Sequence, residues 1–356
     1  MLDDFYYDSV DLLKQLIATP SVSRDETAAA DIVESFARNK MAGEVRRHQN
    51  NIIVTAPGYD PSRHTLLLNS HIDTVKPVEG WTRDPFSPFE DEHERLFGLG
   101  SNDAGASLVS LMAAYRFLTS YKQSYNLVFV ASAEEEVSGK NGFESVVSQL
   151  PEITMAIVGE PTAMNPAVAE KGLMVLDGEA HGVAGHAARN EGVNAIYKAM
   201  DAISILRDFK FEKVSETLGP VKVSVTQISA GTQHNVVPDV CRFVVDVRST
   251  DAYSNEETLS ILRNAAGDEI SLIPRSTRLN PSGIGNDNPV VKRLLLHGRT
   301  PFGSPTLSDQ ALMPWPSVKL GPGESSRSHN ADEYICLHEI REAIELYTRV
   351  LHQLTL

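Results

Sequence analysis

The sequence predicts an α/β protein in which a mostly parallel sheet forms one domain and a smaller, ferredoxin-like domain is inserted into it. Three observations lead to this prediction. Strand-like apolar runs alternate with helical segments from residue 9 to residue 161, the order changes between residues 172 and 276, and the mixed pattern then returns. A chain of 356 residues is long enough for two domains.

The first part of the chain has the alternating order that is typical of a parallel sheet covered on both faces. Apolar residues recur either at helical spacing or in short buried-strand runs. These patterns predict helices at 9–18, 27–41 and 105–121, and strands at 51–58, 64–73, 125–133 and 155–161.

The middle of the chain follows a different order: strand, helix, strand, strand, helix, strand. The predicted elements are 172–182, 192–209, 221–231, 239–250, 254–267 and 269–276. This order is the ferredoxin-like arrangement. The stretch "LNPSGIGNDNP" after it has the composition of a linker. We therefore expect one domain at 1–172 and 285–356, with the inserted domain at 173–284.

Composition excludes several classes of function. A formal net charge of −15 argues against binding to nucleic acid or to a membrane surface. No apolar stretch is long enough to span a bilayer, and the start "MLDDFYYDSV" lacks a signal core. The two cysteines, Cys241 and Cys336, form no C-x-x-C pair, which excludes a cysteine zinc site. We expect a cytoplasmic protein.

Four apolar runs end in residues of the types that commonly bind metals in proteins. The runs end in His71 with Asp73, in Asp103, in the acidic residues 134–136 and in Glu160. Because ligands of open α/β sheets bind at the carboxyl ends of the strands, these side chains are expected to meet. Imidazole and carboxylate together suit zinc and related divalent ions, and a cation would offset the repulsion among the glutamates.

Other interpretations stay open for each piece alone. A run of glutamates also suits a helix N-terminus or a solvated surface, and Glu160 before a proline is a common loop composition. The stretch "GLGSNDAG" resembles a dinucleotide-binding loop, but its sixth position is Asp103, whose carboxylate would repel a pyrophosphate. Neither a G-x-S-x-G elbow nor an H-E-x-x-H helix occurs in the sequence.

Taken together, the motifs resemble a known family, the metal-dependent amidohydrolases that include acetylornithine deacetylase, succinyl-diaminopimelate desuccinylase and carboxypeptidase G. The matching stretches occur in the family's order and span nearly the whole chain. They are "SHIDTV", "GLGSNDAG", "SAEEEVSG", "IVGEPT", "KGLMVLDGEAHGVAGHAA", "HNVVP" and "GPGESSRSHNADEYI". The last stretch is most similar to the acetylornithine deacetylase branch.

The resemblance implies a site for two divalent ions, zinc or cobalt. The implied metal ligands are His71, Asp103, Glu136, Glu160 and His329, with Asp103 bridging the two ions. Asp73 would orient the ring of His71, and Glu135 would be the general base. The family usually has aspartate where this chain has Glu134, so the assignment of roles within the acidic run depends on its alignment.

The resemblance also assigns residues in the inserted domain. It implies that this domain forms a homodimer and that His186 stabilises the oxyanion in the partner's active site. Asn235 and Arg248 would bind substrate, although Arg248 also suits an ordinary charge on a surface strand.

The implied activity is the hydrolysis of an N-acyl amino acid. The expected substrate is N-acetylornithine or an acetyl or succinyl analogue of ornithine or citrulline, as in arginine biosynthesis. Two alternatives remain: a desuccinylase, dipeptidase or carboxypeptidase on the same scaffold, and a silent binding protein. The sequence does not distinguish acetyl from succinyl groups, or one metal from another.

Overall fold

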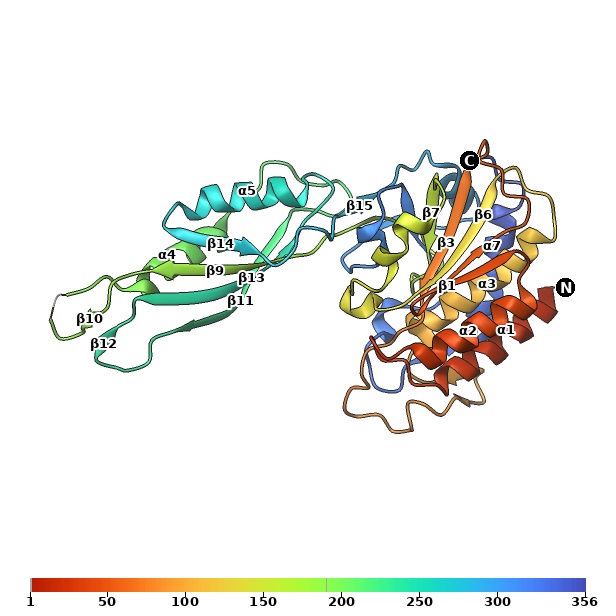
Figure 1. Cartoon of the computed structure of the whole chain (residues 1–356), viewed down its shortest axis with the longest axis horizontal. Helices are drawn as coiled ribbons and strands as arrows, with labels where there is room; N and C mark the ends of the chain where they lie inside the picture. Colours follow the sequence, from red (N-terminus) through yellow and green to blue (C-terminus); the bar gives the residue numbers. More distant parts are fainter. Residues whose placement is uncertain (1, 190) are drawn as a thin grey trace. The chain divides into compact units, whose positions relative to one another are not determined.

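The computed structural model describes residues 2–189 and 191–356, and it divides into two compact units (Figure 1). The first unit comprises Met1–Val168, Gly283–Phe302 and Ser308–Leu356. The second comprises Ala169–Ser282 and Gly303–Leu307. The return of Gly303–Leu307 to the second unit has no counterpart in the sequence prediction.

The first unit is built on a mixed sheet in the order β1-β2-β6-β3-β7-β17-β8-β15, with β16 paired to β8. Its central strands β6, β3, β7 and β17 are parallel, and the flanking pairs β1-β2, β2-β6 and β17-β8 are antiparallel. The strands are β1 (Glu44–His48), β2 (Asn51–Thr55), β3 (Thr65–His71), β6 (Asn126–Ser132), β7 (Met155–Val158), β8 (Ala167–Glu170), β15 (Ser282–Gly283), β16 (Phe302–Ser304) and β17 (Ser317–Lys319). The predicted, mostly parallel central sheet is confirmed.

Long helices cover one face of this sheet. They are α1 (Leu2–Ile17), α2 (Thr27–Lys40), α3 (Ala106–Thr119), α6 (Pro289–Leu296) and α7 (Leu337–Leu351). Helix α3 packs on β3 and β6, and α1 and α7 pack against α3 (Figure 1). Every residue of β3 and β6 is buried. The apolar composition of these runs therefore reflects burial on both faces.

Short turns, not long helices, cover the opposite face. Alternate strand residues such as Leu67 and Val130 join a second apolar cluster there with Phe143 and Val146. The cover consists of 3-10 turns at Phe143–Ser145 and Val147–Gln149, together with Asp309–Leu312. The prediction of a sheet covered on both faces holds, but the second layer is thinner than a helical one.

The run that leads to Asp103 is not part of the main sheet. Its strand, β5 (Arg95–Phe97), lies in a separate three-stranded sheet with β4 (Phe89–Glu90) and β18 (Tyr334–Cys336). Asp103 instead belongs to an irregular turn, Ser101–Gly105, that leads directly into α3. The expectation that four strands of one sheet deliver the polar residues is therefore wrong for this one.

The second unit has the predicted ferredoxin-like arrangement. Its antiparallel sheet has the order β11-β13-β9-β14, and its burial alternates along β9 and β13 because helices cover only one face. A small ribbon pairs β10 with β12. The elements are β9 (Met174–His181), β10 (Gly185–His186), α4 (Ala195–Asp208), β11 (Lys222–Ala230), β12 (Val236–Val237), β13 (Val240–Arg248), α5 (Asn255–Ala266) and β14 (Ile270–Pro274).

Local capping sets where the helices of the second unit begin. The Asn194 side chain accepts a hydrogen bond from the Ile196 amide at the start of α4. Ser254 and Glu257 form a reciprocal capping box at the start of α5. Across the described residues of both units, no helix combines the length and the apolar character that a membrane span needs.

Candidate metal centre

The polar residues that follow β3, β6 and β7 lie at one edge of the main sheet. His71 is the last residue of β3, and Glu160 lies two residues beyond β7. Glu135 and Glu136 begin a 3-10 turn that follows β6. Because β3 is hydrogen-bonded to both β6 and β7 in parallel register, the ends of these strands lie side by side.

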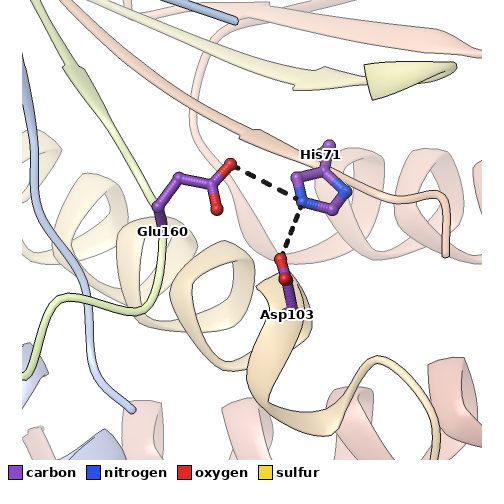
Figure 2. Close-up of side chains that lie close together, drawn as sticks. All are labelled: His71, Asp103 and Glu160. Carbon is purple, nitrogen blue, oxygen red and sulfur yellow. Dashed lines mark hydrogen bonds and ion pairs between the residues drawn. The ribbon is translucent and has the colours of Figure 1, made fainter. Parts of the chain in front are cut away.

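The first group of side chains surrounds the ring of His71, which is 1% exposed (Figure 2). Its Nε2 lies 3.3 Å from Asp103 Oδ1 and 3.7 Å from Glu160 Oε1. Glu135 Oε2 is slightly farther away, at 4.0 Å from the same nitrogen. One imidazole nitrogen therefore faces three carboxylates that come from separate parts of the chain.

The second group is formed around His329, in the loop before β18. His329 Nε2 lies 3.0 Å from Glu136 Oε2 and 3.6 Å from Asp103 Oδ2. Its backbone φ of 59° lies in the left-handed region. The more buried carboxylates of this group, Asp103 and Glu136, face a half-exposed imidazole.

Asp103 belongs to both groups. Its Oδ1 faces His71, and its Oδ2 faces His329. In each group, the three possible ligand atoms lie within 4.8 Å of one another. The groups are His71, Asp103 and Glu160, and Asp103, Glu136 and His329. This arrangement gives two adjacent sets of nitrogen and oxygen donors joined by one carboxylate.

Asp73 connects the histidine to the acidic turn. His71 Nδ1 lies 2.9 Å from the Asp73 carbonyl oxygen, closer than the 3.5 Å to the Asp73 carboxylate. The carboxylate accepts hydrogen bonds from the backbone amides of Glu135 and Glu136 and from Ser23 Oγ. The backbone of Asp73 thus provides the nearer contact to the ring, while its side chain holds the glutamate turn.

Comparison with known proteins places this geometry in a family. Residues 168–271 match the peptidase dimerisation domain of the M20 family, and residues 51–159 match peptidase family M28. Acetylornithine deacetylase from Klebsiella pneumoniae is 30% identical across 96% of this chain and 97% of its own length. The chain belongs to the M20 family.

Solved structures share the M20 fold. Aminopeptidase PepT from Bacillus cereus has a TM-score of 0.77 at 18% identity, with coverage of 97% of this chain and 98% of its own. The YXEP protein of Bacillus subtilis, a dinuclear metal-binding peptidase of the M20 family, has a TM-score of 0.74 at 14% identity, with 98% coverage of both chains. This M20 chain is a hydrolase, and its family performs metal-dependent amide hydrolysis.

The charges in the centre fit a pair of divalent ions. Burial and the charge of Asp103 raise the pKa of Glu160 to about 8. Burial also raises the pKa of Glu136, and it raises the pKa of Glu135 well above its usual range. These carboxyl groups resist ionising together, and cations between them would remove that cost. The donor set of two imidazoles and three carboxylates therefore fits a pair of divalent ions.

Sequence reasoning missed three buried charged residues beside the centre. Asp309 accepts a hydrogen bond from Ser132 Oγ at 2.6 Å, and burial raises the pKa of its carboxyl to about 6. Lys319 ends β17, and its charge acts to lower the pKa of Glu160. Glu333 bonds the backbone around Asp103. A lysine at the end of the apolar run "SVKL" was a usable signal, but the two acids resembled loop residues.

The three residues predicted in the inserted domain do not lie together. His186 is exposed in β10 and pairs with Val236 of β12, and the Asn235 carbonyl accepts a hydrogen bond from the Ala187 amide. Arg248 ends β13, where it is bonded to Asp246. Val240, which begins β13 just after the ribbon, is eight residues from Arg248. At about 3.3 Å per residue this is about 26 Å, so the ribbon and Arg248 lie toward opposite ends of the strand.

Proposed function

We propose that this M20 hydrolase removes the acyl group from an N-acyl amino acid. The proposed substrate is N-acetylornithine, or an acetyl or succinyl analogue of ornithine or citrulline used in arginine biosynthesis. One observation carries the chemistry: two ligand groups share Asp103, and the carboxylate of Glu135 lies beside His71 without belonging to either group. The similarity to acetylornithine deacetylase supports the choice of substrate class.

The proposed metal ligands follow from the two groups. His71 and Glu160 would hold one ion and Glu136 and His329 the other, with one oxygen of Asp103 facing each. Zinc or cobalt suits this mixture of imidazole and carboxylate donors. When bound, such a pair lowers the pKa of water and polarises a carbonyl group.

A carboxylate of the chain would transfer the proton of the attacking water. We assign Glu135 as the general base that takes a proton from the attacking water and returns it to the leaving amine. Its backbone amide is bonded to Asp73, which fixes the turn from which the carboxylate projects. Glu134, the first residue of the run, points elsewhere: its carboxylate accepts a hydrogen bond from Asn141 Nδ2 at 3.0 Å.

We assign substrate contacts to the inserted domain, with two subunits contributing to each site. His186 would stabilise the oxyanion, and Asn235 and Arg248 would bind the substrate. Because the ribbon and Arg248 lie toward opposite ends of β13, one rigid unit is poorly suited to present all three to a single small substrate. A homodimer through this domain resolves the difficulty, with the ribbon of one subunit serving the other.

A substrate panel tests the proposal. The purified chain is incubated with cobalt or zinc and assayed on N-acetyl and N-succinyl derivatives of ornithine, citrulline and diaminopimelate, together with dipeptides. The proposal expects the highest kcat/KM on an ornithine or citrulline derivative. A preference for dipeptides or for succinyl-diaminopimelate would replace it with one of those activities, and no turnover at all would favour a binding protein.

A further inference from the structure

The buried carboxylate of Glu333 accepts hydrogen bonds from the backbone of the turn that contains Asp103. It is 2% exposed and lies four residues after His329. Its Oε1 accepts hydrogen bonds from the amides of Asn102 and Asp103, at 2.8 and 2.9 Å. Its Oε2 accepts a third from the Gly100 amide at 3.0 Å. One side chain thus accepts hydrogen bonds from three of the four backbone amides between Gly100 and Asp103.

Asn102 makes the reciprocal connection. Its side chain is fully buried, and its Oδ1 accepts a hydrogen bond from the Glu324 amide at 3.1 Å. Its Nδ2 donates to the Glu324 carbonyl at 3.1 Å and to Ser328 Oγ at 3.2 Å. A side chain from each loop therefore holds the backbone of the other. The first loop is residues 100–103, and the second is residues 324–333, which include His329.

Close packing leaves the backbone little freedom at Gly100, in the first loop, and at Gly323, just before the second. Gly100 has a φ of 75°, and a Cβ added to it would lie 2.6 Å from Thr74 Cγ2. A Cβ on Gly323, just before the second loop, would lie 2.2 Å from Asn102 Oδ1. A buried backbone amide that loses its acceptor destabilises the fold. The turn at Asp103 is thus held by side-chain acceptors that it cannot easily replace.

We propose that Glu333 and Asn102 are positioning residues that set the metal affinity of the centre by aligning the loops of Asp103 and His329. The inference rests on the proposed function, because it assumes that the two ligand groups hold ions. Asp103 belongs to both groups, whereas His329 belongs to one. Substituting Glu333 should therefore lower the affinity for both ions. Substituting Asn102 should lower chiefly the affinity for the ion held by His329.

The variant Glu333→Gln keeps the size of the side chain but replaces one oxygen with a donor. The new NH2 group of the side chain cannot accept a hydrogen bond. If it occupies the position of Oε2, the hydrogen bond from Gly100 is lost, and if it occupies the position of Oε1, those from Asn102 and Asp103 are lost. Residues that support metal ligands typically change metal affinity by roughly 10–100-fold when mutated. We expect a loss of affinity of that size for both ions in Glu333→Gln, and for one ion in Asn102→Ala.

The experiment titrates the metal-free protein with cobalt. Visible absorption and calorimetry report the two affinities, and the melting temperature of the metal-free form reports folding. Asn126→Ala is the matched control, because buried Asn126 braces a different loop through Asp60 and Arg63. The control should lower the melting temperature while both cobalt affinities stay within about twofold of the wild-type values, well below the expected loss.

Two results would overturn the inference alone: wild-type cobalt affinities in both Glu333→Gln and Asn102→Ala, or equal weakening in Asn126→Ala. Should Glu333→Gln fail to fold, Asn102→Ala and Glu333→Asp decide the question. Rescue by Glu333→Asp is not expected, since its shorter side chain cannot span all three amides. If the wild-type protein itself binds no cobalt, the proposed function fails, and the inference fails with it.

Discussion

Three adjacent glutamates in this chain have three different surroundings. The carboxylate of Glu134 accepts a hydrogen bond from Asn141. That of Glu135 lies near His71, and that of Glu136 faces His329. The left-handed backbone at Glu134, with a φ of 54°, begins the tight turn that separates the three side chains. The similar letters of the run therefore conceal different chemistry at each position.

Substituting the two inner glutamates should separate catalysis from metal binding. Glu135→Gln keeps the shape but removes the base, so activity should fall by roughly 10²–10⁴-fold with metal content near normal. Glu136→Gln removes charge from a ligand group and should lower metal content. Steady-state kinetics and elemental analysis of the same preparations provide the two measurements.

Glu134→Gln is the matched control for metal content, because its carboxylate faces Asn141 and not the ligand groups. It should retain both ions. If Glu135→Gln loses metal while Glu136→Gln keeps it, the roles within the run are displaced by one residue.

At the scale of elements, every helix and strand predicted between residues 9 and 276 has a counterpart in the structure, because its apolar periodicity reflects the layers that bury it. The short strands β1, β8, β10 and β12 and the elements after residue 276 were not predicted individually. The start of α1 was placed too late, at residue 9 instead of Leu2. The origin of Asp103 was also missed. A strand-like run precedes it, but pairing with β18, more than 200 residues later in the chain, places that run in another sheet.

The supporting residues of the centre were harder to predict for a related reason. Glu333, in a loop, and Asp309, in a 3-10 turn, are buried acids in segments where sequence composition suggests exposure. Their roles depend on hydrogen bonds to residues far away in the sequence, such as Asp103 and Ser132. Motifs identify side chains that touch a ligand more readily than those that hold another loop in place.

The second unit offers a prediction about packing. Gly178 of β9 lies directly opposite Phe243 of β13, and an added Cβ would lie 2.3 Å from the Phe243 ring. Because that ring is 2% exposed, it has little room to move. Gly178→Ala should destabilise this unit by about 1–3 kcal/mol, measured by denaturant unfolding.

The control for this substitution is Gln227→Ala, on the uncovered face of the same sheet, where the side chain is exposed. It should leave stability nearly unchanged. Equal stability of Gly178→Ala and the wild-type protein would show that the ring can shift, contrary to the close contact in the structure.

The whole molecule is expected to hold a fixed number of metal ions. Two ligand groups that share Asp103 predict two divalent ions per chain after loading with zinc or cobalt. Elemental analysis should approach that value, and a chelator should abolish activity until metal is restored. A reproducible content near zero, with activity unaffected by chelation, would contradict the proposed mechanism.

Each active site is expected to contain residues from two subunits. His186 and Arg248 lie toward opposite ends of the inserted unit's sheet, so we propose that a partner supplies His186 to each active site. Glu135→Gln and His186→Ala chains should each be inactive alone. In a mixed dimer, one site combines the intact Glu135 of one chain with the intact His186 of the other.

Mixing the two variants under conditions that exchange subunits should therefore restore activity. The recovered rate should follow the fraction of mixed dimers, which native mass spectrometry of differently tagged chains can measure. Mixing Glu135→Gln with Glu136→Gln is the matched control, because both changes lie on the same chain segment and should leave every site defective. If exchange is confirmed and the first mixture stays inactive, His186 acts within its own subunit, and the two-chain active site is wrong.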